Sequence, residues 1–182
     1  MRRFAGVALL VALAGCGAQF TAPAPRTFDL GLAAPGVKLP ALRATSLRAV
    51  APFDGVQMYY RLAWRNPSEL ADYAHSRWAA PPAELVRKQL VRAAGEGSAK
   101  CGLEIELQEF TQVFASKEAS EARIELRASL ASASARIATR GVTIVEPGAG
   151  TDAASGAAAM ARAAERVLGD LAGWIRTQPG CA

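Results

Sequence analysis

Two segments of the chain alternate apolar and polar side chains with the two-residue period of a half-buried β-strand. In 123–130 the even-numbered residues are apolar and the odd-numbered residues are polar, and 103–108 alternates in the same way. The second alternation breaks near Glu109, after which Phe110 and Phe114 fall on the opposite parity. A β-bulge at this point would return both phenylalanines to the apolar face.

Three weaker segments also predict strands. In 57–64, Met58, Tyr60, Leu62 and Trp64 fall on one side. The segment 45–50 is expected to pair beside it. The segment 136–145 alternates weakly and ends at the turn residues 146–148, which read Glu-Pro-Gly.

Two segments carry the 3.6-residue period of an amphipathic helix. The first begins at Pro81-Pro82 and ends before Gly95, and the second runs from about Asp152, a predicted N-cap, to Arg176. The order is strands, helix, strands, helix. We therefore predict an α+β fold, with an antiparallel sheet covered on one face by two amphipathic helices.

The first sixteen residues have the pattern of a bacterial lipoprotein signal. Two arginines follow Met1, residues 4–12 are apolar but too few to span a bilayer, and Leu13-Ala14-Gly15-Cys16 matches the lipobox. This predicts a signal peptide over 1–15 and lipidation of the Cys16 thiol, which only a cysteine can provide. The alternative is an ordinary secretory signal with a coincidental cysteine.

The residues after Cys16 suggest where such a lipoprotein would reside. Position 17 is Gly17, whereas an aspartate there favours retention in the inner membrane of Gram-negative bacteria. The similarity to these lipoproteins therefore implies the outer membrane, on its periplasmic face. Residues 16–27 are small and proline-rich and predict a lipidated, flexible tether, followed by a single periplasmic α+β domain over 28–182.

Composition narrows the classes of function. The 182 residues suffice for one domain, and the formal net charge of +5 falls to +3 when Arg2 and Arg3 are removed with the signal peptide. This balance predicts no nucleic-acid partner. His75 is the only histidine and has no evident nucleophile beside it, so we predict no enzyme, no cofactor and no metal site. Glu104 and Glu106 share the polar face of a strand.

Two cysteines remain once Cys16 is lipidated. An even number in an oxidising periplasm suggests that Cys101 and Cys181 form a disulfide, which would tie the C-terminal segment to the start of a strand. The alternative is two free thiols.

Short motifs along the mature chain resemble the ABC-type transport auxiliary lipoprotein family, the PqiC-like group. The resemblance covers a Phe-Asp-Leu-Gly opening, a Tyr-Arg strand, a Tyr…Arg-Trp-Ala…Pro segment and an alanine-rich final helix that ends near Trp174. The corresponding motif residues are Asp29, Leu30, Gly31, Tyr60, Arg61, Tyr73, Arg77, Trp78 and Pro82. A phenylalanine, Phe28, stands where a tyrosine is commoner in the family.

The resemblance implies a function without catalysis. Proteins of this family are outer-membrane lipoproteins that act with MCE-domain (mammalian cell entry) proteins and ABC transporters, which move lipids between the two membranes. We therefore expect a docking component of such a system, held by Cys16, with self-association into a homo-oligomer left open. The motif residues are expected to be structural. The alternative is a periplasmic lipid-binding shuttle or chaperone that holds an acyl chain between helices and sheet.

Overall fold

The computed structural model describes residues 24–181, except residues 98, 134, 149 and 180. The predicted signal peptide and Cys16 lie outside the described residues. Arg26 and Thr27, the last residues of the predicted tether, belong to the first strand. The first described strand therefore begins two residues before the predicted domain boundary.

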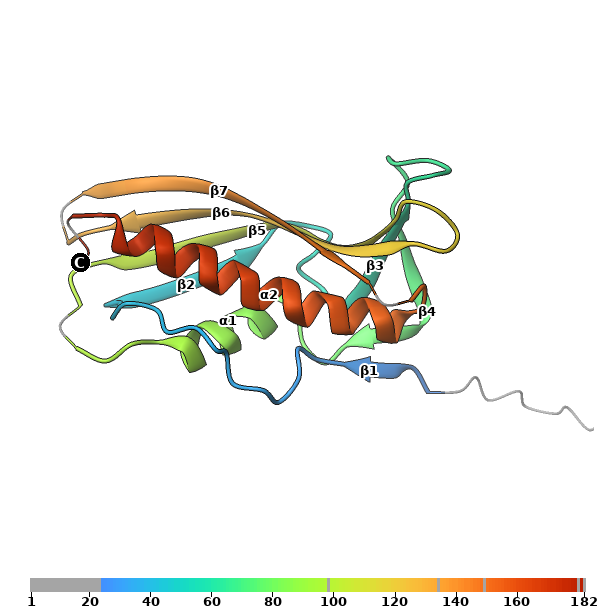
Figure 1. Ribbon diagram of the computed structural model, residues 1–182, viewed down its shortest axis with the longest axis horizontal. Helices are drawn as coiled ribbons and strands as arrows, with labels where there is room; N and C mark the ends of the chain where they lie inside the picture. The colour runs from blue at the N-terminus through green and yellow to red at the C-terminus, as the bar shows by residue number, and fades with distance from the viewer. Residues whose placement is uncertain (1–23, 98, 134, 149, 180, 182) are drawn as a thin grey trace, which may run out of the picture.

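Seven strands and two helices follow one another along the described chain (Figure 1). They are β1 (Arg26–Phe28), β2 (Ala44–Ala49), β3 (Gln57–Leu62), β4 (Ala71–Trp78), α1 (Pro82–Ala93), β5 (Gly102–Phe114), β6 (Ser120–Ala131), β7 (Arg136–Pro147) and α2 (Ala153–Arg176).

The centre of the fold is an antiparallel meander of the three long strands β5, β6 and β7. Leu103 lies opposite Leu130, and Leu107 opposite Leu126, so that the apolar residues of both strands share one face. The register shifts between Leu107 and Glu109, which confirms the predicted bulge. This shift keeps Phe110 on the apolar face, where it is buried.

The prediction of an antiparallel sheet is wrong, because the sheet is mixed. Along one edge of β5, β2 pairs with the first half and β3 with the second half, both in the parallel direction. β1 also pairs with β4 in parallel. The segment expected to pair beside β3 therefore pairs with β5 instead. A two-residue alternation is common to both ladder types, so it reports burial of one face and not strand direction.

Strand β4 has no counterpart among the predicted strands. It runs antiparallel to β3, and its register jumps from Gln57–Arg77 to Tyr59–Asp72. Residues 73–76 therefore lie opposite Met58 alone. This irregularity disrupts the alternation by which strands are recognised in a sequence.

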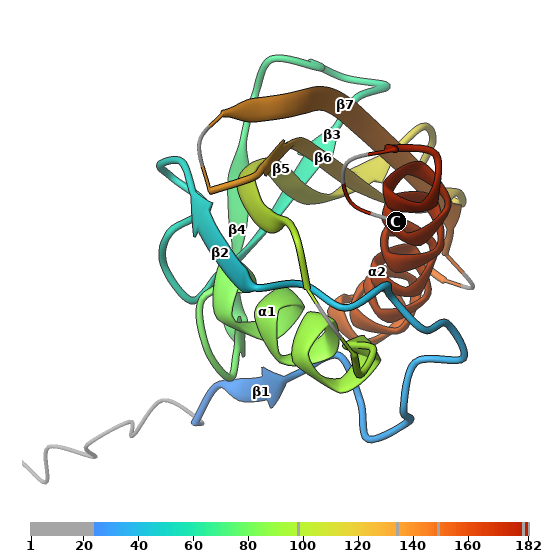
Figure 2. The same cartoon turned by 90° about the vertical axis from the view of Figure 1, so that its left-hand side faces the viewer.

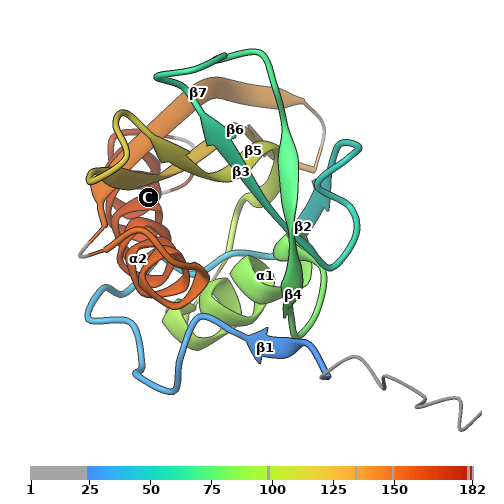
Figure 3. The same ribbon diagram turned by 90° about the vertical axis from the view of Figure 1, so that its right-hand side faces the viewer.

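Both helices lie in the concave side of the curved sheet, with α2 below β6 and β7 and α1 beside β2 (Figures 2 and 3). Helix α2 begins where the Asp152 carboxylate accepts a hydrogen bond from the Ser155 N–H at 2.7 Å, as the sequence predicted. The core lies between the layers, and its largest fully buried side chains include Phe110, Leu103, Leu107, Ile124, Leu126, Leu130, Met160, Leu168, Leu171 and Ile175. Burial of this apolar surface is the main force that holds helices to sheet. Neither helix in the described part of the chain combines the length and apolarity needed to span a bilayer.

Candidate functional site

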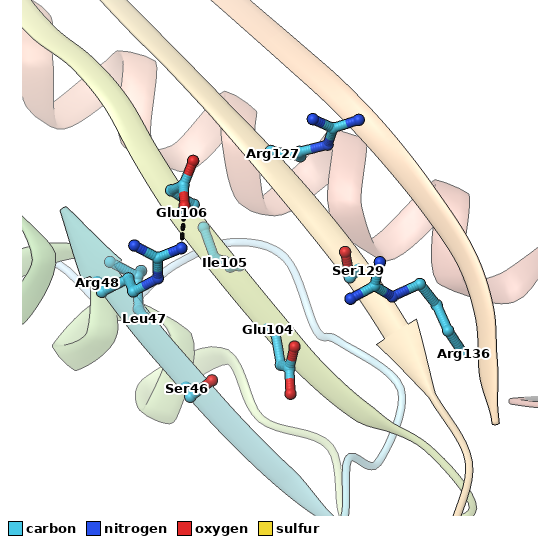
Figure 4. A pocket seen from close by; sticks show the side chains of 9 residues that line it. All are labelled: Ser46, Leu47, Arg48, Glu104, Ile105, Glu106, Arg127, Ser129 and Arg136. Atoms are coloured by element: carbon cyan, nitrogen blue, oxygen red, sulfur yellow. Dashed lines mark hydrogen bonds and ion pairs between the residues drawn. The ribbon is translucent and has the colours of Figure 1, made fainter. Parts of the chain in front are cut away.

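The convex face of the sheet carries a hollow of about 660 Å³ over β2, β5, β6 and the start of β7 (Figure 4). We call it the arginine groove and define it by Arg48, Glu104, Glu106, Arg127, Ser129 and Arg136. Strand register brings these residues together, because Glu106 lies beside both Arg48 and Arg127 while Glu104 lies beside Ser129.

The groove contains two arginines whose side chains have no partner in the described part of the chain. The Arg48 guanidinium pairs with the Glu106 carboxylate. The guanidinium groups of Arg127 and Arg136 make no hydrogen bond or ion pair with any described residue, and Figure 4 shows the Arg136 guanidinium beside Ser129. Unpaired guanidinium groups bind carboxylates and phosphates through planar, bidentate hydrogen bonds. The groove, with three arginines against two glutamates, can therefore bind an anionic group.

The motif tyrosines lie on the opposite, concave side. The rings of Tyr60 and Tyr73 are 4.8 Å apart between centroids. The Tyr73 hydroxyl donates to Gln112 Oε1 at 2.8 Å, and Gln112 Nε2 donates to Ser120 Oγ at 2.8 Å. Ser120 Oγ in turn donates to the Gly150 carbonyl at 2.6 Å. These bonds satisfy the polar groups that would otherwise be buried without partners.

Burial also raises the pKa of the Tyr73 hydroxyl, which begins this chain of hydrogen bonds. Desolvation, with smaller contributions from Tyr60 and Asp152, raises the pKa of Tyr73 to about 12. The hydroxyl is therefore a neutral donor at physiological pH. Its hydrogen-bond partner, the Gln112 side-chain amide, is not a base that could remove the tyrosine proton. The hydrogen bonds from Tyr73 to Gly150 therefore have the properties of a structural network.

Gly156 allows α2 to approach this network. A Cβ atom at that position would lie 2.1 Å from Gln112 Oε1 and 2.6 Å from Gln112 Cδ. Contacts this short do not occur, so any larger residue would displace either the helix or the glutamine side chain.

The other half of the Tyr-Arg motif lies across the sheet from the tyrosines. Arg61 makes a bidentate ion pair with Glu109, with Nε–Oε1 and Nη2–Oε2 distances of 2.9 and 3.1 Å. Thr111 Oγ1 also donates to Glu109 Oε1 at 2.7 Å. The bulge in β5 places Glu109 on this face, where the half-buried pair joins β3 to β5.

The Asp-Leu-Gly motif forms a turn after β1. The Asp29 carboxylate accepts a hydrogen bond from the Gly31 N–H at 2.8 Å. Gly31 has φ +84°, a conformation that favours glycine. Leu30 between them is buried in the core.

The Arg-Trp…Pro motif occupies the end of β4 and the start of α1. Trp78 is buried with its ring 5.3 Å from that of Phe110, and Pro82 is the first residue of α1. Arg77 is exposed. The motif residues therefore occupy separate structural positions and do not converge on one site.

The remaining chemical candidates are dispersed. His75 is exposed on β4, and the described residues contain no cluster of three or more metal-ligating side chains. Glu104 and Glu106 lie in the arginine groove. Cys101 and Cys181 are joined by a disulfide with a Cα–Cα distance of 5.3 Å, which ties the segment after α2 to the start of β5.

Sequence reasoning did not identify the groove. The alternation of β6 placed Arg127 on the polar face, which was a partial signal. The groove also requires β2 beside β5 in parallel register and Arg136 at the start of β7. Arg136 begins the strand that the sequence predicted over 136–145, whereas the parallel pairing of β2 with β5 is a long-range feature that local patterns do not report.

Solved structures share this fold. A Xanthomonas campestris protein of the family DUF330 superposes with a TM-score of 0.68 at 24% sequence identity, over 81% of this chain and 93% of that one. An uncharacterized protein superposes with a TM-score of 0.66 at 11% identity, over 84% of this chain and 99% of its own. No family model and no curated protein sequence matches the chain. At these identities the likeness establishes the fold.

Proposed function

We propose that this chain is a PqiC-like auxiliary lipoprotein, which is held in the outer membrane by Cys16 and docks an MCE-type ABC lipid-transport system without catalysing a reaction. The observation that carries the proposal is the agreement between motifs and fold. The motif residues resemble the PqiC-like group, and the fold is shared with a DUF330 protein, the family that includes that group.

The roles of the motif residues support this assignment. Tyr60 and Tyr73 pack the concave side, Arg61 joins two strands, and Trp78 lies in the core. Residues in such roles stabilise a shape, as expected of a docking domain, and do not assemble acid–base or nucleophilic machinery.

The arginine groove is the surface where we expect the partner to bind. The guanidinium groups of Arg127 and Arg136 have no partner among the described residues, so an acidic segment of the MCE-domain protein would satisfy both of them. The contact would also gain from long-range attraction between the positive groove and an acidic surface.

The structure does not favour the alternative of a lipid shuttle. The space between α1, α2 and residues 33–35 measures about 190 Å³. Ligand pockets ordinarily measure about 300 to 1,000 Å³. A larger hollow of about 670 Å³ lies between α2 and β7, but its lining is mostly charged, which does not suit an acyl chain; the charged residues are Glu146, Arg162, Glu165, Arg166 and Asp170.

Photo-crosslinking in cells tests the proposal. A photoreactive amino acid in place of Ser129 should capture an MCE-domain protein, identified by mass spectrometry. Arg127→Glu together with Arg136→Glu should abolish capture from a second photoreactive position, at Ser46 in the same hollow. Lys88→Glu, an exposed charge reversal on α1, is the matched control and should leave capture unchanged.

The membrane anchor is tested separately. A Cys16→Ser variant should lose palmitate labelling and membrane association. If well-expressed, lipidated protein captures no MCE-domain protein from either groove position, the proposed docking function is wrong.

A further inference from the structure

Trp64 differs from the other two tryptophans in its exposure. Its exposed fraction is 45%, whereas Trp78 and Trp174 are exposed by 3% and 7%. Trp64 lies in the connection between β3 and β4. Trp64 is not part of the hydrophobic core, so its surroundings indicate what else this side chain could contact.

Two connections meet at this tryptophan. The Trp64 backbone N–H donates to the Phe114 carbonyl at the end of β5, at 3.3 Å. The Lys117 ammonium lies 5.6 Å from the centre of the Trp64 ring. We call residues 63–70 and 115–119 together the tip. The hydrogen bond and the cation–π contact hold the two halves of the tip side by side.

The tip lies at the end of the molecule where the described chain begins. Figure 1 shows the β3–β4 and β5–β6 connections at the same end of the long axis as the start of β1, and Figure 3 shows the β3–β4 connection and β1 on opposite sides of that end. Cys16 lies ten positions before Arg26, and a fully extended chain of that length reaches about 36 Å at most. If Cys16 is anchored as proposed above, the start of β1 lies within about 36 Å of the bilayer, and this end of the domain is the one nearest the anchor.

The chemistry of the tip fits a phospholipid surface. A tryptophan ring is amphipathic and is favoured at the boundary between headgroups and acyl chains. Arg65 and Lys117 are exposed beside it and can pair with lipid phosphates. Glu69 and Glu118 are exposed there too, so the tip carries both signs of charge and the tryptophan is the main contributor to the contact.

We propose that the tip is a membrane-contact surface that places Trp64 in the headgroup region of the phospholipid bilayer to which Cys16 is anchored. The proposal rests on the proposed lipid anchor. Glu104 in the arginine groove lies ten residues along β5 from Phe114, about 33 Å at 3.3 Å per residue. Contact through the tip therefore directs the groove away from the membrane, toward the space from which a periplasmic partner would approach.

Fluorescence quenching tests the contact. The full-length lipidated protein is reconstituted into vesicles of phosphatidylethanolamine and phosphatidylglycerol, some of whose acyl chains are brominated. We expect brominated lipid to quench the tryptophan emission of the unchanged protein. Trp64→Phe should abolish this quenching, because only the two buried tryptophans remain.

A matched control places a tryptophan elsewhere on the surface. Val91, in the last turn of α1, is exposed by 61%, and Figure 1 shows that end of α1 pointing away from the tip. In a Trp64→Phe background, Val91→Trp should give emission that brominated lipid does not quench.

The outcomes separate this proposal from the anchor. The membrane contact alone is overturned if the protein co-floats with the vesicles and carries the acyl mass on Cys16, but brominated lipid does not quench Trp64 emission. Equal quenching of tryptophans at 64 and 91 also overturns it, because the domain would then have no fixed orientation. Protein without the acyl mass overturns both the anchor and the contact that rests on it.

Discussion

Replacing both Cys101 and Cys181 by alanine should lower the free energy of unfolding by about 4.5 kcal/mol. The cysteines are 80 residues apart in sequence. In the chain-entropy model, a crosslink that closes a loop of this length removes about 15 cal/mol/K of entropy from the unfolded chain, or about 4.5 kcal/mol at 25 °C. The loss approaches the whole stability of many domains, which is about 5 to 15 kcal/mol.

Urea unfolding followed by far-UV circular dichroism measures this effect in two ways. The midpoint should fall, and the dependence of the unfolding free energy on urea should steepen, because the unfolded chain without the crosslink exposes more surface. The unchanged protein treated with a reductant should give the same curve as the double variant. Stability within about 1 kcal/mol of the parent, with an unchanged slope, would refute the reasoning that the bond constrains the unfolded chain.

Three further predictions concern α2 and its contacts. Gly156→Ala should cost about 1–3 kcal/mol, because its new methyl group clashes with the Gln112 side chain on β5. Gly173→Ala in the same helix should stabilise the protein by up to about 1 kcal/mol, because its Cβ would meet no described atom within 4 Å beyond its chain neighbours and the adjoining helix backbone. Thermal unfolding distinguishes the two variants. Because the pKa of Tyr73 is raised from 10.0 to about 12, the stability that its neutral hydroxyl contributes should be lost as pH rises from 10 toward 12. In an absorbance titration of tyrosine ionisation, the step near pH 12 should be absent from Tyr73→Phe. Hydrogen bonds from Arg162 and Arg166 lower the pKa of Glu146 below 4.5, so the stability that these bonds confer should be lost as pH falls below that value. In urea unfolding at a series of pH values, Arg162→Ala should show a weaker loss of stability in acid.

The elements that the sequence predicts are those whose burial is regular along the chain. Residues 123–130 alternate without interruption because one face of β6 lies on α2 and the other is open to solvent. Helix α2 is equally regular, and its N-cap at Asp152 depends on a hydrogen bond to a residue three positions away. The bulge in β5 could be inferred because it shifts the phase of a long strand.

The elements that the sequence misses depend on distant residues. Nothing within 45–50 indicates that β2 pairs in parallel with a strand more than 50 residues later. The Arg61–Glu109 pair requires both that parallel arrangement for β3 and the phase shift at the bulge. In the sequence, nothing distinguishes the groove arginines from other surface arginines, because only the pairing of four strands places them side by side. Local patterns therefore predict which face is buried, and tertiary pairing determines what the other face can bind.

The position of β5 in the chain determines the order in which the fold can form. β2 and β3 both pair with β5, but they precede it, so the first hundred residues are synthesised before the strand that completes their hydrogen bonding. The apolar surfaces of Met58 and Tyr60 therefore stay exposed until β5 and α2 have been synthesised. Exposed segments of this kind are prone to aggregation and are natural clients of chaperones. This domain should accordingly fold late, after its chain has left the ribosome, and a chain truncated before β5 should fail to accumulate.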